Sequence, residues 1–452
     1  NASGSGNGGS GVDGVYQINA GLNTGVGGNG WGAGTWGRGT WGSGAAIGVT
    51  TSLRMWSHDN FGEDLLINPR DGAIFYWDKS SGVTTRAVDI GTVSGAEETP
   101  ITAKQIMVSD VDRHVIAFGT NPVGSAIQDP LLIRFSDQES LTDWNPKATN
   151  TAGDLRIGSG SEFVRAIETK REIIIFTDSS VHSMQFIGAP FTFGIQPLAS
   201  NTTIMGPNTA IAVEDAVFWM GRQNFYVYDG KTQQLPCTVK ERVFFDFNYD
   251  QAHKVFAGVI SEFSEVIWFY CSNTNSVANG GTGENDRYVI YNYAEQTWVY
   301  GQLSRTAWLD AGIENYPRAV SSGYLYQQEI GFDDDGSPMT NVFIESSDFD
   351  IGDGEQFTFI RRIIPDFKFI QDTSENGSVN IVVKTRNFPG DSLTTNSTSA
   401  IQSSTQQAYV RGRARQMVLR FESDDDAANN GNLGIGWRLG ATRIDIRTDG
   451  RR

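Results

Sequence analysis

One hairpin-like unit recurs along the chain: an apolar run, a polar turn, an aromatic-rich run and a second turn marked by Asp or Gly. The clearest copy is AVFWMGRQNFYVYDG, residues 216–230. Related units begin near Asp64, His114, Glu172, Glu265 and Arg318. A single hairpin cannot bury its apolar face, and these units repeat roughly every 50 residues, close to the ~40–50 residues of a propeller blade. The repeat therefore predicts a β-propeller of about six blades.

The two runs of each unit are typical of paired strands. EDLLIN (63–68) and AIFYWD (73–78), for example, flank a turn at Pro69–Gly72. Short runs of β-branched and aromatic residues between Gly, Asn, Asp and Pro favour strands, and no stretch shows helical periodicity. A β-sandwich would give shorter and more even spacing. Because a propeller must close to hide its sheet edges, we expect the first blade to borrow a strand from elsewhere.

Composition divides the chain into three parts. Residues 1–48 are rich in Gly and carry Trp31, Trp36 and Trp41 at five-residue spacing. Dense Gly opposes regular helix, so this part is expected to be an arm whose Trp rings pack on the body or on a neighbouring subunit; a disordered leader is the alternative. Residues 49–346 hold the propeller, and residues 347–452 form a C-terminal β-sheet domain. The predicted fold is thus all-β.

The C-terminal domain contains four strand-rich segments, 357–369, 378–386, 408–423 and 436–450, with a Ser/Thr-rich polar loop predicted at 392–405. It is also rich in arginine: Arg411, Arg413, Arg415, Arg420, Arg438, Arg443, Arg447, Arg451 and Arg452. Alternation along a strand puts such side chains on one face. An interface is the favoured use, since Arg is enriched at interfaces. Contact with phosphate and pairing with acidic neighbours are the alternatives.

Charge limits the possible partners. The chain has 52 acidic and 35 basic residues and a net charge of −17. Such a surface repels phosphates and argues against ordinary DNA or RNA binding, although it suits a passage through which a polyanion slides.

Cys237 and Cys271 lie in apolar stretches and are expected to be free thiols. No apolar run approaches the ~20 residues of a membrane span, no signal peptide is visible, and the sequence begins at Asn1 rather than Met.

Motifs for catalysis, cofactors and metals are weak. The Gly25–Gly30 string matches a dinucleotide fingerprint only by letters, because it follows no strand and opens no helix. Acidic turns could bind calcium but lack EF-hand spacing; they lie at Asp333–Asp335, at Asp348, Asp350 and Asp353, and at Asp424–Asp426. The four histidines are scattered: His58, His114, His182 and His253. Ser136–Trp144 lacks the Gly of the sialidase Asp-box turn. We expect no enzyme, no cofactor and no metal site.

Several strings together resemble the tail hub or nozzle proteins of short-tailed bacteriophages, a family that includes the packaged-DNA stabilisation proteins. They are 61–78, 135–146, 173–188, 206–221 and 323–336, framed by GWGAGTWGRGTWGS and by the closing GWRLGATRIDIRTDGRR. The resemblance covers most of residues 20–452. Family members usually have a further segment ahead of the Gly-rich stretch, which the given sequence does not include.

The resemblance implies a virion protein of the phage tail. Six copies would form a ring below the portal and its adaptor, contact the tail fibres and enclose the DNA exit channel. Cyclic symmetry lets one chain build such a tube through a head-to-tail interface. The ring would retain packaged DNA and conduct it during ejection without sequence-specific binding. An acidic lumen would keep the DNA from adhering as it passes. The alternatives are a carbohydrate-binding or glycan-cleaving propeller for host recognition and a secreted adhesin.

Overall fold

The computed structural model describes residues 55–451 except 189, 313, 335, 353, 372–376 and 426–431. The chain divides into two compact units, Asn1–Gln328 and Glu329–Arg452. The arm predicted at 1–48 and the Gly25–Gly30 string lie outside the described residues.

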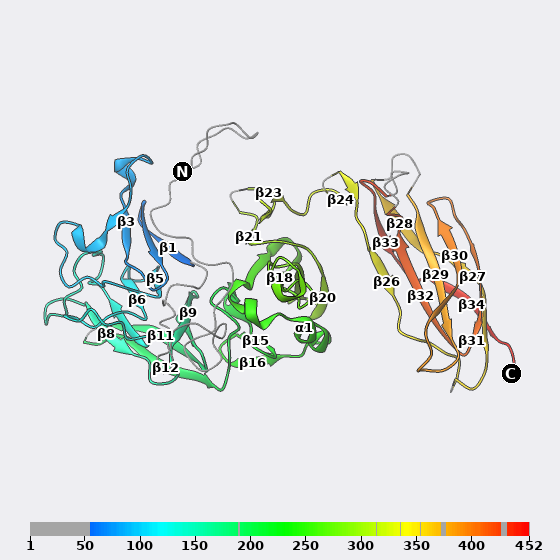
Figure 1. The fold of residues 1–452 in the computed structure, drawn as a ribbon, viewed down its shortest axis with the longest axis horizontal. Helices are drawn as coiled ribbons and strands as arrows, with labels where there is room; N and C mark the ends of the chain where they lie inside the picture. Colours follow the sequence, from blue (N-terminus) through cyan, green and yellow to red (C-terminus); the bar gives the residue numbers. More distant parts are fainter. Residues whose placement is uncertain are drawn as a thin grey trace, which may run out of the picture. The chain divides into compact units, whose positions relative to one another are not determined.

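The first unit is a propeller whose consecutive antiparallel sheets are blades 1 to 6, coloured blue to yellow-green in Figure 1. Blade 1 holds β1 (Trp56–Phe61), β2 (Asp64–Pro69), β3 (Phe75–Trp77) and β4 (Val88–Asp89); blade 2 holds β5 (Gln105–Val108), β6 (Val115–Phe118), β7 (Leu132–Phe135) and β8 (Gly153–Arg156). Blade 3 holds β9 (Phe163–Glu168), β10 (Ile173–Thr177), β11 (Ser180–Gly188) and β12 (Thr192–Ser200); blade 4 holds β13 (Ala210–Val213), β14 (Ala216–Met220), β15 (Phe225–Tyr228) and β16 (Thr232–Leu235). Blade 5 holds β17 (Phe256–Ile260), β18 (Glu265–Tyr270), β19 (Arg287–Asn292) and β20 (Thr297–Gln302); blade 6 holds β21 (Ala307–Leu309), β22 (Arg318–Ser321) and β23 (Tyr324–Gln327).

The hairpins predicted from the sequence are the middle strands of blades 1 to 5, and in blade 6 the hairpin is β22 with the edge strand β23. In blade 4, for example, β14 pairs with β15 through Val217 opposite Tyr228. Blade 1 consists of four consecutive strands, so the expectation that it borrows a strand is wrong. Blade 6 has three strands in the described part of the chain. Helical structure is short; it comprises α1 (Lys240–Asp246), η1 (Lys79–Ser81), η2 (Ile90–Thr92), η3 (Tyr249–Lys254), η4 (Ser261–Phe263) and η5 (Val277–Asn279).

The blades pack through the alternating side chains of their middle strands. On β10, Ile173 and Ile175 face the cluster shared with blade 2, whereas Ile174 and Phe176 face the cluster shared with blade 4. Successive strand residues point to opposite faces, so a middle strand with both faces covered reads as a continuous apolar run. The same division recurs on β14 and β18. Apolar burial between neighbouring blades therefore holds the propeller together.

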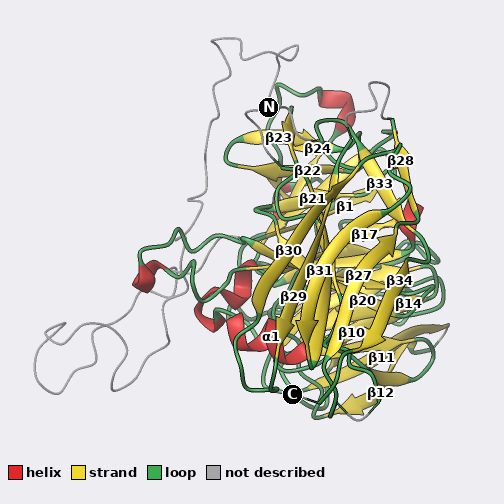
Figure 2. Ribbon diagram, turned by 90° about the vertical axis from the view of Figure 1, so that its right-hand side faces the viewer, coloured by secondary structure: helices red, strands yellow, loops and turns green. Residues whose placement is uncertain are grey.

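The second unit (yellow to red in Figure 1) contains two sheets around one core. One sheet has the order β26-β32-β29-β30 and the other β31-β27-β34, with the pair β28-β33 beside the short hairpin β24-β25. The strands are β24 (Asp333–Asp334), β25 (Ser337–Pro338), β26 (Phe343–Glu345), β27 (Thr358–Ile364), β28 (Phe367–Ile370), β29 (Val379–Arg386), β30 (Thr394–Ile401), β31 (Ala408–Ala414), β32 (Gln416–Ser423), β33 (Gly436–Leu439) and β34 (Arg443–Thr448). Strands β31, β27 and β34 run side by side in Figure 2.

Two details of the second unit differ from the sequence-based expectation. The boundary falls between Gln328 and Glu329 rather than at 346/347, because β26 pairs with β32 in the C-terminal sheet. The stretch predicted as a polar loop at 392–405 is largely strand β30, which pairs with β29. As an edge strand with an exposed face, β30 tolerates Ser and Thr, and its β-branched Thr residues fit a pleated backbone.

Candidate functional site

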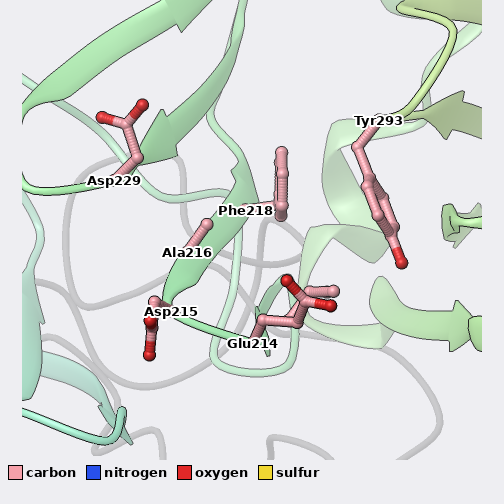
Figure 3. A pocket seen from close by; sticks show the side chains of 7 residues that line it. Glu214, Asp215, Ala216, Phe218, Asp229 and Tyr293 are labelled. Carbon is pink, nitrogen blue, oxygen red and sulfur yellow. The ribbon is translucent and has the colours of Figure 1, made fainter.

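A pocket of about 570 Å³ lies where the first strands of blades 4, 5 and 6 meet. Tyr293, Trp308 and Leu309 supply its apolar surface, and Glu214 and Asp310 its carboxylates. A smaller neighbouring pocket of about 200 Å³ lies between blades 4 and 5. Figure 3 shows the acidic side chains around this smaller pocket and the rings of Phe218 and Tyr293, whose centroids are 6.0 Å apart.

The polar groups of the larger pocket take part in structural hydrogen bonds. Asp310 accepts hydrogen bonds from the backbone N–H of Ser261, at 3.2 Å, and from its hydroxyl. The indole N–H of Trp308 donates to the Val259 carbonyl at 3.0 Å. Asp310 therefore joins blade 6 to the turn after β17. Because Asp310 is engaged in these bonds, the described pocket residues do not present the free pair of facing carboxyls that glycoside hydrolysis needs.

A second concentration of polar groups lies on β9, whose free edge carries no neighbouring strand within its sheet. Gln105 of β5 spans this edge: its amide donates to the Ala166 carbonyl at 2.8 Å, and its oxygen accepts from the Ala166 N–H at 2.9 Å. Arg70 donates to the carbonyls of Val164 and Phe163 at 3.0 and 3.1 Å. Side chains of blades 1 and 2 thus satisfy backbone groups that a further strand would otherwise pair.

Glu168, at the end of β9, lies among other carboxylates. Burial raises its pKa from 4.5 to about 7, and the charges of Asp110, Asp59 and Asp112 add to the rise. The N–H of Asp110 donates to its Oε1 at 3.0 Å and partly offsets this shift. In the native state the Glu168 carboxyl therefore takes up a proton near neutral pH.

The pH dependence of stability follows from this raised pKa. A carboxyl with a raised folded pKa stabilises the protein fully below its unfolded pKa of about 4.5, and the contribution is lost as the pH rises through about 7. We expect the melting temperature of the propeller unit to fall across this window in the native protein. Glu168→Gln, which keeps the acceptor for Asp110, should flatten the decline in calorimetric scans. An unchanged pH profile in the variant would contradict the assignment.

Of the arginines named from the sequence, four lie on the sheet β31-β27-β34: Arg411, Arg413, Arg443 and Arg447. Along β31, Tyr409, Arg411 and Arg413 are exposed and the alternate residues are buried. Phe359 of β27 lies between Arg413 and Arg447 in the strand register. Arg413 pairs with Asp449, and Arg362 with Asp445 at 3.5 Å. No ion pair is found for Arg361, Arg411, Arg443 or Arg447 within the described chain. We call the outward side of this sheet the arginine face.

The other arginines named from the sequence have different surroundings. Arg415 lies 5.5 Å from the ring centres of Phe357 and Phe388. Arg420 pairs with Glu345 and Glu422, Arg451 lies 3.6 Å from Glu355, and Arg438 is exposed on β33. Arg452 lies outside the described residues. Pairing with acidic neighbours therefore describes part of the set, and use of the arginines at an interface stays a prediction.

The histidines do not come together. His114 is buried, 3.2 Å from Asp112 and 2.9 Å from the Thr151 hydroxyl. His182 Nε2 lies 2.9 Å from the Ser180 hydroxyl, while His58 is on β1 and His253 in η3. Over the described ranges no three His, Cys, Asp or Glu side chains are grouped as a metal site would require.

The acidic turns named from the sequence are engaged locally or lie outside the described residues. Asp333 accepts from the Gly336 N–H at 3.0 Å, and Asp348 pairs with Arg386. Asp350 and Asp424 belong to the described residues and lie far apart in the sequence. Asp335, Asp353 and Asp426 lie outside the described residues. The described residues of these turns are not grouped into one site of three or more carboxylates.

The cysteines are free thiols, as predicted, with Cys271 buried and Cys237 half-buried. Burial raises the pKa of each thiol to about 11, so both are protonated at neutral pH. Among the helices that the structure describes, none is long and apolar enough to cross a membrane.

Comparisons with known proteins identify no family. No protein-family model matches the chain, and neither does any curated protein. Among solved structures, the AfRom2 CNH domain is similar over 60% of this chain and 78% of its own, with 11% identity and a TM-score of 0.33. Hsv2 of Kluyvelomyces marxianus matches over 60% and 75%, with 6% identity and a TM-score of 0.33. A mutant Synechocystis apocarotenoid oxygenase matches over 60% and 65%, with 8% identity and a TM-score of 0.33. Similarity at this level supports no functional inference.

Proposed function

We propose that this chain is a structural subunit of the tail hub or nozzle of a short-tailed bacteriophage. In this proposal it forms a homo-oligomeric ring, with six copies expected, around the DNA exit channel of the virion. The ring retains packaged DNA and conducts it during ejection without sequence-specific binding. The portal adaptor and the tail fibres are its expected neighbours. The order of the strings quoted above supports the phage assignment.

The observation that carries the proposal is the arginine face. Four of its guanidinium groups have no ion-pair partner within the described chain, although the chain has a net charge of −17. Arginine is enriched at protein interfaces and pairs in a fork-like geometry with carboxylates. A second copy of such an acidic chain supplies carboxylates in excess. A different patch on each partner is what a head-to-tail ring requires.

Exposed apolar side chains on the propeller unit also support assembly. The loop joining β11 and β12 is flanked by Phe186, Ile187 and Phe191, which are 45%, 56% and 72% exposed. These three side chains lie close together along one hairpin. Contiguous exposed apolar side chains commonly mark interaction sites, whereas single ones do not.

Mass photometry of the full chain tests the ring. We expect a species near six times the chain mass of 49.4 kDa. Reversing charge on the arginine face with Arg411→Glu and Arg447→Glu should shift the distribution toward the single-chain mass. Arg86→Glu, at an exposed position of the propeller unit, is the matched control and should leave the ring intact. A single-chain mass at all concentrations, with or without these changes, would contradict the proposal.

Carbohydrate binding is the second candidate function, and the larger pocket favours it. Tyr293 and Trp308 offer aromatic surface, and Glu214 offers hydrogen-bond acceptors. Aromatic faces with a few placed polar groups are typical of small-ligand pockets. Glycan-array binding that is lost in Trp308→Ala would support this function, and the ring proposal expects no such binding.

A further inference from the structure

Two arginines from different blades meet at the free edge of β9. Contacts between consecutive first strands, such as β9 with β13 and β13 with β17, place these strands at the centre of the propeller. Arg165 belongs to β9, opposite Phe176 of β10. Arg70, which follows β2, reaches the same edge and binds the carbonyls of Phe163 and Val164. The positive charges of the two guanidinium groups repel each other.

The nearby carboxylates are already engaged. Lys104 Nζ lies 3.4 Å from Asp71 and 3.2 Å from Glu162. Arg70 uses two of its five N–H donors for backbone carbonyls. The side chain of Arg165, by contrast, has no hydrogen bond or ion pair in the described chain, and its Nε is buried without an acceptor. The group contains three cations and two carboxylates, so one positive charge is left without compensation. A charge held away from water without a partner is unfavourable.

We propose that Arg165 and Arg70 bind an oxyanion of the phosphate class at the central edge of β9. The planar fork of a guanidinium group matches phosphate oxygens through paired hydrogen bonds. As a whole residue Arg165 is half-buried, although its Nε is covered. This site belongs to the single chain and does not depend on the proposed ring.

The protonation state of Arg165 suits this role. Burial, and then the charge of Arg70, lower its pKa to about 10. The group therefore remains a cation at neutral pH, and a bound anion would relieve both effects. Arg70 also carries a structural contact to β9, which makes Arg165 the better position for substitution.

Calorimetric titration of the full chain with inorganic phosphate, at constant pH and ionic strength, tests the site. Arg165→Gln is expected to weaken phosphate binding by at least about tenfold, because it removes a charge-assisted contact. Arg171→Gln is the control; Arg171 is exposed in the turn after β9, 4.0 Å from Asp215, and its loss should leave phosphate affinity unchanged. No binding by the native chain, or equal binding by Arg165→Gln, would overturn the proposal.

Thermal scans give a second readout that does not rely on affinity. Phosphate should raise the melting temperature of the native protein more than sodium chloride of equal ionic strength. Without phosphate, Arg165→Gln should melt higher than the native protein, since the uncompensated charge is gone, and should show no phosphate-specific rise. A phosphate-specific rise retained in Arg165→Gln would place the anion elsewhere and overturn the assignment.

A competition experiment between inorganic phosphate and DNA identifies the source of the phosphate group. A short DNA duplex that displaces inorganic phosphate from the native protein, but has no effect on Arg165→Gln, would identify a nucleic acid backbone as the source. Phosphate binding that the duplex does not disturb would identify a free phosphate compound. Both results support the site, and the titrations above can refute it.

Discussion

Replacing Trp268 with alanine is expected to lower the free energy of unfolding of the propeller unit by about 3–5 kcal/mol, the range for removing a large aromatic side chain from a packed core. Trp268 is fully buried on β18. Its indole N–H donates to the Thr209 carbonyl at 2.9 Å, and its ring centroid lies 5.1 Å from that of Phe225 in blade 4. The substitution therefore removes apolar contact and a hydrogen bond between two blades together.

Differential scanning calorimetry measures this effect and offers two controls. Trp56→Ala removes a ring that is 49% exposed at the start of β1, and it should change the melting temperature little. The transition of the C-terminal unit should also stay in place, because that unit has its own core. A loss below about 1 kcal/mol for Trp268→Ala would show that the contact between blades 4 and 5 is not a major source of stability.

The second large effect is expected at Gln105. Gln105→Leu should destabilise the propeller unit by about 2–6 kcal/mol, since the N–H and C=O of Ala166 would each lose their partner, at about 1–3 kcal/mol per buried group. Both residues are buried, so solvent cannot easily replace the lost hydrogen bonds. The two bonds, at 2.8 and 2.9 Å, join β5 to the edge of β9.

Urea unfolding monitored by far-ultraviolet circular dichroism tests this prediction. Gln233→Leu is the matched control, because Gln233 is exposed on β16 and donates only to Asp229, at 3.3 Å. It should change the unfolding free energy by no more than about 0.5 kcal/mol, as surface substitutions commonly do. Equal unfolding midpoints for the two variants would mean that Gln105 does not stabilise β9.

The parts of the fold that the sequence predicted are those with both faces covered. The runs at 173–177 and 265–270 are continuous apolar strands because each packs against two neighbouring blades. Outer strands such as β16, with sequence TQQL, and β8, with sequence GDLR, are half exposed and carry no such pattern. Strand β30 also lacks a continuous apolar run, and for this reason its sequence predicted a loop. Strand periodicity also predicted the shared side of Arg411 and Arg413, since alternation on β31 is a local property.

The sequence by itself determined the all-β class, the repeated hairpins and the shared side of the exposed arginines, because each follows from the order of neighbouring residues. Only the tertiary structure decided which side chains meet at the centre of the propeller. Gln105 reaches Ala166, and Arg70 reaches Phe163 and Val164, across long stretches of sequence. No local pattern encodes such contacts, since they depend on how one blade is rotated against the next.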